Sequence, residues 1–63
     1  MSLCEDIKAR RKRAALTQKE LGERIGVAEA TVCKYENGDR VPSLPVAKRM
    51  AAVFGCTVDE LGA

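Results

Sequence analysis

The sequence contains no histidine and no tryptophan, and it has only two prolines and three cysteines. Without histidine, both the commonest general base and a common zinc ligand are missing. Cys4, Cys33 and Cys56 are an odd number without a CxxC pair, so neither a disulfide framework nor a zinc site is predicted. No glycine-rich phosphate loop occurs either. We therefore expect no enzyme, no cofactor and no metal, in a reduced intracellular chain.

Long hydrophobic runs are also absent. The longest uncharged stretch, from Met50 to Val58, is far too short to span a bilayer, and no signal peptide opens the sequence. Only Tyr35 and Phe54 are aromatic, and 63 residues give room for one small domain with a thin core. We expect a single domain over residues 1–63, in the cytoplasm, with no membrane partner and no small-molecule ligand.

Charge is unevenly distributed along the chain. The net charge is +2, from 11 Lys and Arg against 9 Asp and Glu, but residues 8–13 (KARRKR) carry five positive charges and no negative one. Arg10, Lys12 and Arg13 are solvated by default and are candidates for contact with a nucleic-acid backbone. A nuclear-import signal is an alternative interpretation of this run. The expectation that the segment forms an ordered helix argues against it.

Apolar residues recur at spacings of three and four without strand-like alternation, so the predicted fold class is all-α. Three capping boxes, each a Ser or Thr followed three residues later by Glu, predict helix starts at Ser2, Thr17 and Thr57. The first helix is expected to bury a stripe of Leu3, Ile7, Ala14 and Ala15. The second is expected to bury Leu21 and Ile25 and to end at Gly26.

The remaining pattern completes a predicted bundle of five helices. The third helix runs from Glu29 to Asn37, with Val32 and Tyr35 inward and Gly38 as its stop. The fourth is capped by Ser43 and holds Pro45 in its first turn, where a missing N–H costs nothing. Its expected buried face is Leu44, Ala47, Met50, Val53 and Phe54, ended by Gly55. The last, short helix holds Val58 and Leu61.

The second and third helices are joined by a three-residue turn, Gly26 to Ala28. This is the spacing of a helix-turn-helix, which projects its second helix into the DNA major groove. A generic αα-hairpin is the alternative. A glycine inside a helix, such as Gly22, lowers helix stability by about 1 kcal/mol relative to Ala. We interpret it as the residue that lets the two helices cross closely.

Two charged residues fall on stripes that should be buried. Arg11 comes four residues after Ile7, and Glu36 comes four residues after Val32. A charge removed from water is tolerable when it is paired and hydrogen-bonded. We therefore predict an ion pair between Arg11 and Glu36, the alternative being that each side chain extends to solvent.

Residues 7–61 resemble the phage-repressor (Cro/CI or XRE-type) helix-turn-helix family. The similarity lies in Ile7, Arg11, TQKELGERIG (17–26), VAEATVCKYENG (27–38), Pro42, Ser43, LPVAKRMAAVFG (44–55) and TVDEL (57–61). It implies a lambda-repressor-like five-helix bundle that binds operator DNA as a homodimer, nucleoid-associated and of bacterial or phage origin. It also implies the roles of particular residues: Gln18 beside a DNA phosphate, Arg11 and Glu36 as a structural pair, Asn37 and Arg40 on the DNA backbone, and Glu29, Ala30 and Lys34 at base edges.

The outer face of the third helix is the expected reader of DNA bases. Steps of 100° place Ala30, Cys33, Lys34 and Asn37 opposite the buried side, flanked by Glu29 and Thr31. Lys34 can donate to guanine O6 and N7, with phosphate contact or plain solvation as alternatives, and Ala30 or Thr31 can lie against a thymine methyl. Cys33 is either a base contact or a tolerated small residue, and Gln18 either a phosphate contact or a surface glutamine.

Two residues depart from the family pattern. Ala28 stands where a Ser or Thr usually caps the third helix, which should lose about 0.5–2 kcal/mol of capping. Its first N–H groups are then left for water or a phosphate. Glu29 repels phosphates, and it helps only by accepting a hydrogen bond from a cytosine amino group.

The sequence thus predicts a sequence-specific double-stranded DNA-binding transcriptional regulator, a repressor. It is expected either as a minimal Cro-like protein or as the DNA-binding part of a longer one. An antitoxin or anti-repressor-like protein-binding module is the alternative on the same fold. Any of Val53, Phe54, Val58 and Leu61 that the core does not use would mark the dimer interface.

Overall fold

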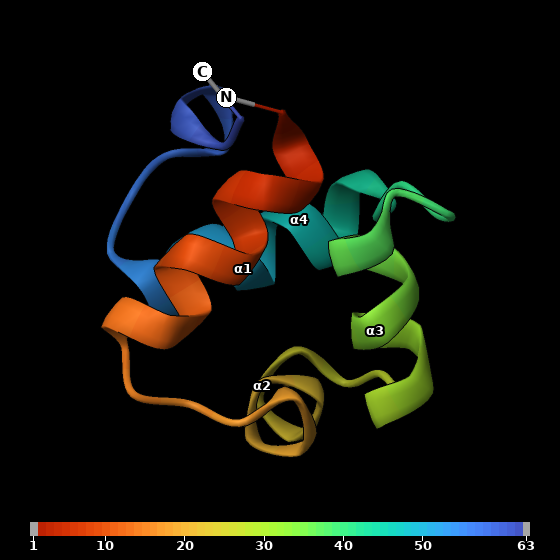
Figure 1. Cartoon of the computed structure of the whole chain (residues 1–63). Helices are drawn as coiled ribbons and strands as arrows, with labels where there is room; N and C mark the ends of the chain where they lie inside the picture. The colour runs from red at the N-terminus through yellow and green to blue at the C-terminus, as the bar shows by residue number, and fades with distance from the viewer. Residues whose placement is uncertain (1, 63) are drawn as a thin grey trace.

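The computed structural model describes residues 2–62, which form four α-helices and one short 3₁₀ turn (Figure 1). The elements are α1 (Leu3–Arg13), α2 (Gln18–Ile25), α3 (Glu29–Asn37), α4 (Leu44–Phe54) and the 3₁₀ turn η1 (Val58–Glu60). No strand occurs in residues 2–62, so the all-α prediction is confirmed for them. Nor does this part of the chain contain a helix long and apolar enough to cross a membrane. Residues 1 and 63 of the expected domain lie outside the described residues.

Side-chain caps fix where most of the elements begin. Ser2, Thr17 and Thr57 each accept from the backbone N–H of the Glu three residues on, and that Glu accepts from the cap's own N–H. All three predicted capping boxes are therefore present, and each satisfies donors that the helix itself leaves unpaired. The hydrogen bonds from Thr17 lower the pKa of Glu20, and those from Thr57 lower the pKa of Glu60. Ser43 caps α4 through the N–H of Val46.

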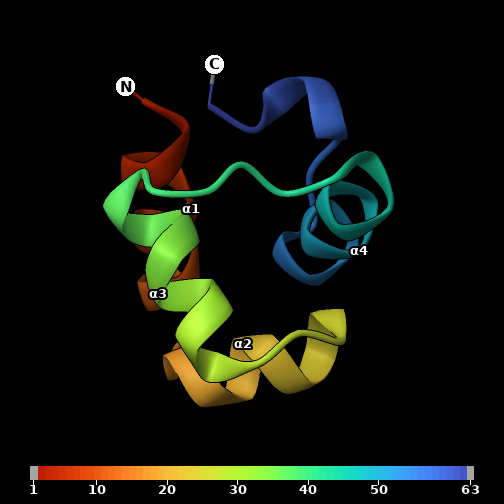
Figure 2. The ribbon, with the colours of Figure 1, turned by 90° about the vertical axis from the view of Figure 1, so that its right-hand side faces the viewer.

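The core lies where the four helices meet. α2 contacts α3 and α4, α1 contacts α3, and α4 contacts η1, an arrangement that can be followed in Figures 1 and 2. The buried cluster consists of Ile7, Leu21, Ile25, Val32, Tyr35 and Met50. Every one of these residues comes from an α-helix, and α2 and α3 supply four of them, so the core holds these two helices in a fixed relation.

Two helical predictions are wrong. The expected fifth helix is only the single turn η1, because the backbone is already extended at Leu61, with a φ of −67° and a ψ of 120°. Three residues are too few to nucleate an α-helix. α1 stops at Arg13 and does not continue through Ala14 and Ala15, both of which are exposed. Ala15 takes the left-handed conformation, with a φ of +58°, and so leads the chain away from the axis of α1.

The predicted buried face of α4 is wrong at its first residue and omits Ala51, which is buried. Met50 is buried, and Ala47, Val53 and Phe54 are half-buried. Leu44 is instead 59% exposed, because it is the first residue of α4 and adjoins the loop 38–43 that crosses from α3 (Figure 2). The helix periodicity is thus correct, but its first turn projects beyond the core.

A polar contact joins the first helix to the end of the chain. Asp6, 5% exposed, accepts from the backbone N–H of Gly62 at 2.9 Å and from the Arg10 guanidinium at 2.8 Å. The Gly62 N–H holds the pKa of Asp6 below its usual value, and Arg10 lowers it further. Arg10 also donates to the carbonyl of Glu60. These bonds, which the sequence did not predict, fasten η1 and the residues after it to α1.

Candidate nucleic-acid interface

The candidate interface is built on α2, α3 and the turn of three residues between them. Gly26 ends α2 in the left-handed conformation with a φ of +76°, as predicted, and Ala28 is the N-cap of α3. A Cβ on Gly22 would lie 2.6 Å from the carbonyl oxygen of Val27. The predicted close approach at Gly22 is therefore real, but the group it accommodates is the backbone of the turn.

The outer face of α3 is accessible, as the 100° steps predict. Val32, Tyr35 and Glu36 are buried, whereas Ala30 and Lys34 are exposed. Of the other candidate base-reading residues, Glu29 is exposed, and Thr31 and Cys33 are half-buried. The buried side anchors α3 in the bundle, so its small and cationic side chains face solvent together.

The start of α3 has no side-chain cap. Ala28 supplies only its carbonyl, which accepts from the N–H groups of Thr31 and Val32, and no side-chain oxygen accepts from the first turn within residues 2–62. The unpaired N–H groups carry the positive end of the helix dipole. They lie beside Glu29 and Ala30, at the end of α3 nearest the turn. Water or an anion can serve as their acceptor.

The predicted ion pair between Arg11 and Glu36 is present and bidentate. Arg11 Nε donates to Glu36 Oε2 at 2.6 Å, and Arg11 Nη2 donates to Glu36 Oε1 at 3.2 Å. The side chain of Arg11 is 11% exposed and that of Glu36 is 2% exposed. Arg11 Nη1 donates further to the carbonyl of Leu16 at 2.7 Å. One guanidinium thus ties α1 to α3 and to the loop that leads into α2.

Gln18, the expected phosphate contact, is the first residue of α2 and is half-buried. Its Nε2 donates to Glu36 Oε1 at 3.2 Å, a bond that the sequence analysis missed. A signal for it existed, because a carboxylate offers about four acceptor sites and a buried Glu36 calls for donors beyond Arg11. Gln18 is therefore not a free surface glutamine.

The other expected backbone contacts lie at the far end of α3. Asn37 is exposed, and its Nδ2 donates to Cys33 Sγ at 3.5 Å. Arg40 is exposed in the loop 38–43, and no acidic side chain pairs with it among residues 2–62. The same loop carries Val41, which is 74% exposed. Lys34, Asn37 and Arg40 all belong to α3 or to the segment that directly follows it.

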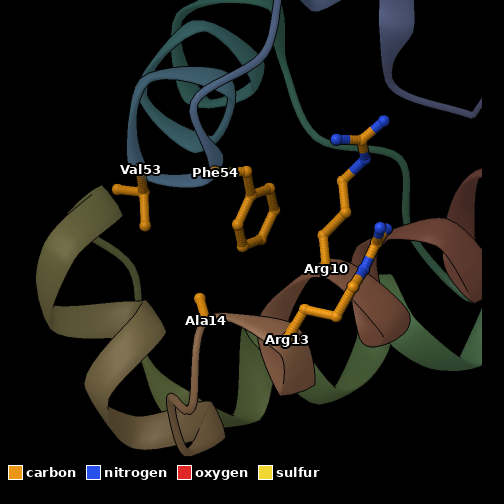
Figure 3. Close-up of a pocket in the computed structure, with 5 residues that line it drawn as sticks. All are labelled: Arg10, Arg13, Ala14, Val53 and Phe54. Carbon is orange, nitrogen blue, oxygen red and sulfur yellow. The ribbon is translucent and has the colours of Figure 1, made fainter.

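The basic run divides into paired and exposed side chains. Arg11 forms an ion pair with Glu36, and Arg10 forms one with Asp6. The hydrogen bond to Asp6 raises the pKa of Arg10. Lys12 and Arg13 are exposed. Arg13 and Arg10 line an open pocket of about 200 Å³ with Ala14, Val53 and Phe54 (Figure 3). No residue of α3 lines this pocket, so it is separate from the candidate interface.

Comparison with known proteins identifies this arrangement. Residues 7–61 match the model of the helix-turn-helix family. The chain belongs to this helix-turn-helix family. The αα-hairpin alternative is thereby excluded, and α2 and α3 are its helix-turn-helix pair.

Solved structures of similar helix-turn-helix chains include two that hold DNA. The P22 c2 repressor in complex with a synthetic operator has a TM-score of 0.92 at 26% identity, over 97% of this chain and 92% of that one. SinR, named as the master regulator for biofilm formation and solved in complex with DNA, has a TM-score of 0.85 at 28% identity, over 94% and 95% of the two chains.

Proteins similar to this chain in sequence are described as HTH-type transcriptional regulators. An uncharacterized HTH-type transcriptional regulator of Methanothermobacter thermautotrophicus is 45% identical over 49 residues, which cover 78% of this chain and 71% of that protein. The HTH-type transcriptional regulator YgzD of Bacillus subtilis is 36% identical over 55 residues, which cover 87% and 83% of the two chains. This helix-turn-helix chain therefore has relatives in both archaea and bacteria.

Proposed function

We propose that this chain is a sequence-specific double-stranded DNA-binding transcriptional regulator that acts as a repressor, with α3 in the major groove. The observation that carries the proposal is the outer face of α3, where Ala30 and Lys34 are exposed beside the buried Val32 and Glu36. The likeness to P22 c2 and SinR, both solved with DNA, supports it. Its action on DNA assigns it to the cytoplasm and the nucleoid.

Base readout is assigned to the exposed side of α3. Lys34 is the candidate donor to guanine O6 and N7, and Ala30 and Thr31 are small enough to contact a thymine methyl. Glu29 is the candidate acceptor for a cytosine amino group. Cys33 is the remaining candidate; it is half-buried, and its Sγ accepts from Asn37 Nδ2.

Backbone contacts are assigned to Gln18, Asn37 and Arg40. Gln18 lies at the start of α2, and its backbone N–H belongs to the donors that a helix leaves unpaired. Asn37 ends α3 and Arg40 lies in the loop that follows, while the Gln18 side chain contacts Glu36 in the last turn of α3. Such contacts position a protein on duplex DNA without specifying its sequence.

We also propose that the chain binds as a homodimer whose contact is formed by Val41 and Leu44. Helix-turn-helix dimers usually place their two reading helices in two DNA half-sites that lie about 34 Å apart. Val41, in the loop after α3, and Leu44, the first residue of α4, are 74% and 59% exposed. Of the four residues considered from the sequence, Val53, Phe54 and Leu61 pack against the core, and Val58 is half-buried. The exposed surface of two such side chains is on the order of 200 Å² per copy, and burying it contributes about 5 kcal/mol at roughly 25 cal/mol/Å². A stable interface needs about 800 Å² per partner, so we expect pairing only where DNA holds two copies together.

The deciding experiment is selection of bound duplexes from a random pool, followed by titration of the selected duplex. Its matched control is a scrambled duplex of the same length and composition. We expect preference for the selected duplex and an affinity that falls between about 50 and 200 mM salt, as counterions are released. Absence of any retained duplex at low salt would refute the proposal.

One observation favours a second candidate, a protein-binding module of the antitoxin or anti-repressor kind. Glu29 places an exposed negative charge at the end of α3 that the proposal directs toward DNA. Glu29→Gln separates the two functions, because it removes repulsion from phosphates. A regulator should keep or gain nonspecific DNA affinity on this change, whereas a module that uses the carboxylate for a basic partner should lose that partner.

A further inference from the structure

The buried carboxylate of Glu36 is shared between two donors from different elements. Its Oε2 accepts from Arg11 Nε, and its Oε1 accepts from both Arg11 Nη2 and Gln18 Nε2, each at 3.2 Å. With the Glu36 side chain 2% exposed, these protein donors replace water around it. In residues 2–62 no buried side-chain nitrogen or oxygen lacks a hydrogen-bond partner.

This contact selects one orientation of the Gln18 carboxamide. An ionised carboxylate only accepts hydrogen bonds, so the NH₂ group of Gln18, and not its carbonyl oxygen, must face Glu36. One of the two Nε2 hydrogens is used in that bond, and the other remains free to donate. A long, flexible side chain is thus held in one rotamer at the first residue of α2.

The backbone around Gln18 is fixed by the same network. Arg11 Nη1 holds the carbonyl of Leu16 at 2.7 Å, and Thr17 caps α2 through the N–H of Glu20 at 3.0 Å. The entry into α2 is therefore tied to α1 through Leu16 and to α3 through Glu36. Contacts of this kind reduce the ordering that must otherwise accompany binding.

We propose that Glu36 is a positioning residue for DNA-backbone binding, acting through Gln18. It holds the second Nε2 hydrogen and the backbone N–H of Gln18 ready for one phosphate, while Arg11 balances the charge of Glu36 and keeps it buried. The inference rests on the proposed function, and it adds that the ion pair serves binding as well as stability. In the absence of Glu36, Gln18 must be ordered by the DNA itself.

The variant that removes this role is Arg11→Met combined with Glu36→Met, which also removes the Arg11 hydrogen bond to the Leu16 carbonyl. It removes both charges together, so the net charge is unchanged and no buried charge is left unpaired, and such replacements are often neutral or stabilising. Gln18→Ala is the matched variant at the contact itself. Circular dichroism first establishes that each chain is folded at the temperature of the binding assay.

The first measurement is made on the free protein by ¹⁵N NMR. The chain has one glutamine, Gln18, and one asparagine, Asn37, so only two side-chain NH₂ pairs occur. We expect the Gln18 pair to be ordered in the wild type and mobile in the double-methionine variant, with the Asn37 pair unchanged as an internal reference. A Gln18 pair that is equally mobile in both would overturn the positioning role.

The second measurement is the affinity for the selected duplex and for duplexes in which single phosphates are replaced by neutral methylphosphonates. A hydrogen bond to a charged group corresponds to about a tenfold or greater change in Kd. We expect Gln18→Ala and the double-methionine variant to lose a similar factor, to become insensitive to the same phosphate, and to show no further loss when combined.

The outcomes separate the two hypotheses. Wild-type affinity in the folded double-methionine variant overturns the positioning role while leaving the proposed function intact. A wild-type chain that binds no duplex overturns the proposed function, and the DNA role of Glu36 with it, even when the NMR spectrum shows an ordered Gln18.

Discussion

Substitution of Glu36 by Ala should remove a large part of the stability of this small protein. The change leaves the Arg11 guanidinium, 11% exposed, with the Leu16 carbonyl as its remaining protein acceptor. Breaking a buried pair by removing one partner costs about 3–5 kcal/mol. A chain of 63 residues has a total stability of about 3–9 kcal/mol, at about 0.05–0.15 kcal/mol per residue. The expected loss therefore ranges from about a third of the total stability to all of it.

Urea unfolding at pH 7, followed by circular dichroism, measures this loss. With a slope of about 1 kcal/mol/M, the unfolding midpoint should fall by about 3 M or disappear. If no folded baseline remains, titration with a stabilising osmolyte recovers it. The double-methionine variant of the pair is the control, and it should unfold near the wild-type midpoint because no charge is stranded.

A small effect would refute this reasoning. Surface substitutions usually change stability by no more than about 0.5 kcal/mol. If the change in the free energy of unfolding for Glu36→Ala falls within that range, the Arg11 guanidinium reaches water when its partner is removed. The pair would then not carry the energetic cost of a buried one. The alternative, that the Arg11 side chain extends to solvent, would then hold.

Three further predictions concern other parts of the molecule. Lys34→Ala should relax base preference by about 1–3 kcal/mol at one or two positions without moving the melting temperature, and equal losses on all sequences in a selection would make Lys34 a phosphate contact. Gly22→Ala should destabilise, because a clash of 2.6 Å with the Val27 carbonyl costs about 1–3 kcal/mol, against about 1 kcal/mol gained in helix propensity. A higher urea midpoint for this variant would contradict it. Asp6 has its pKa lowered from 3.8 in the folded chain, chiefly by the Gly62 N–H. The stability that the Asp6 carboxylate contributes is therefore present above pH 3.8, and it is lost as the pH falls through the lower pKa of the folded state. Asp6→Asn should cost about 1 kcal/mol at pH 7 and less below pH 3.8, and an identical cost at both pH values in urea titrations would count against the contact.

The sequence predicts the elements whose ends are marked by side-chain or glycine chemistry. α3 has the predicted bounds because Gly26 and Gly38 enclose a single run of helical spacing, and α2 has the predicted start because Thr17 and Glu20 form a capping box. A capping box states where a helix begins but not how long it is. Thr57 and Glu60 therefore suggested a fifth helix where only η1 exists.

The end of α1 shows the opposite difficulty, an end without a sequence signal. Ala14 and Ala15 are good helix formers, and no glycine follows Arg13. A left-handed alanine costs about 1–2 kcal/mol, which the sequence gives no reason to expect. Arg11 supplies the reason, because its guanidinium binds the Leu16 carbonyl and holds the turn. This contact depends on the position of Glu36, 25 residues away in the chain, so it is visible only in the fold.

Buried polar contacts were predictable where the residues violate the hydrophobic pattern, and they were not predicted where the residues do not. Arg11 and Glu36 stand on buried stripes, so pairing was the only inexpensive explanation for both. Gln18 and Asp6 occupy positions where a polar residue is ordinary, so their own positions do not reveal these bonds, and for Gln18 the signal lay only in the unfilled acceptor sites of the buried Glu36. Both are nevertheless bound to groups far along the chain, Gln18 to Glu36 and Asp6 to Gly62. Because Arg11 and Arg10 are paired with Glu36 and Asp6, the basic run contributes less to DNA attraction than its sequence suggests. Lys34 and Arg40 are exposed cations of α3 and of the loop that follows it.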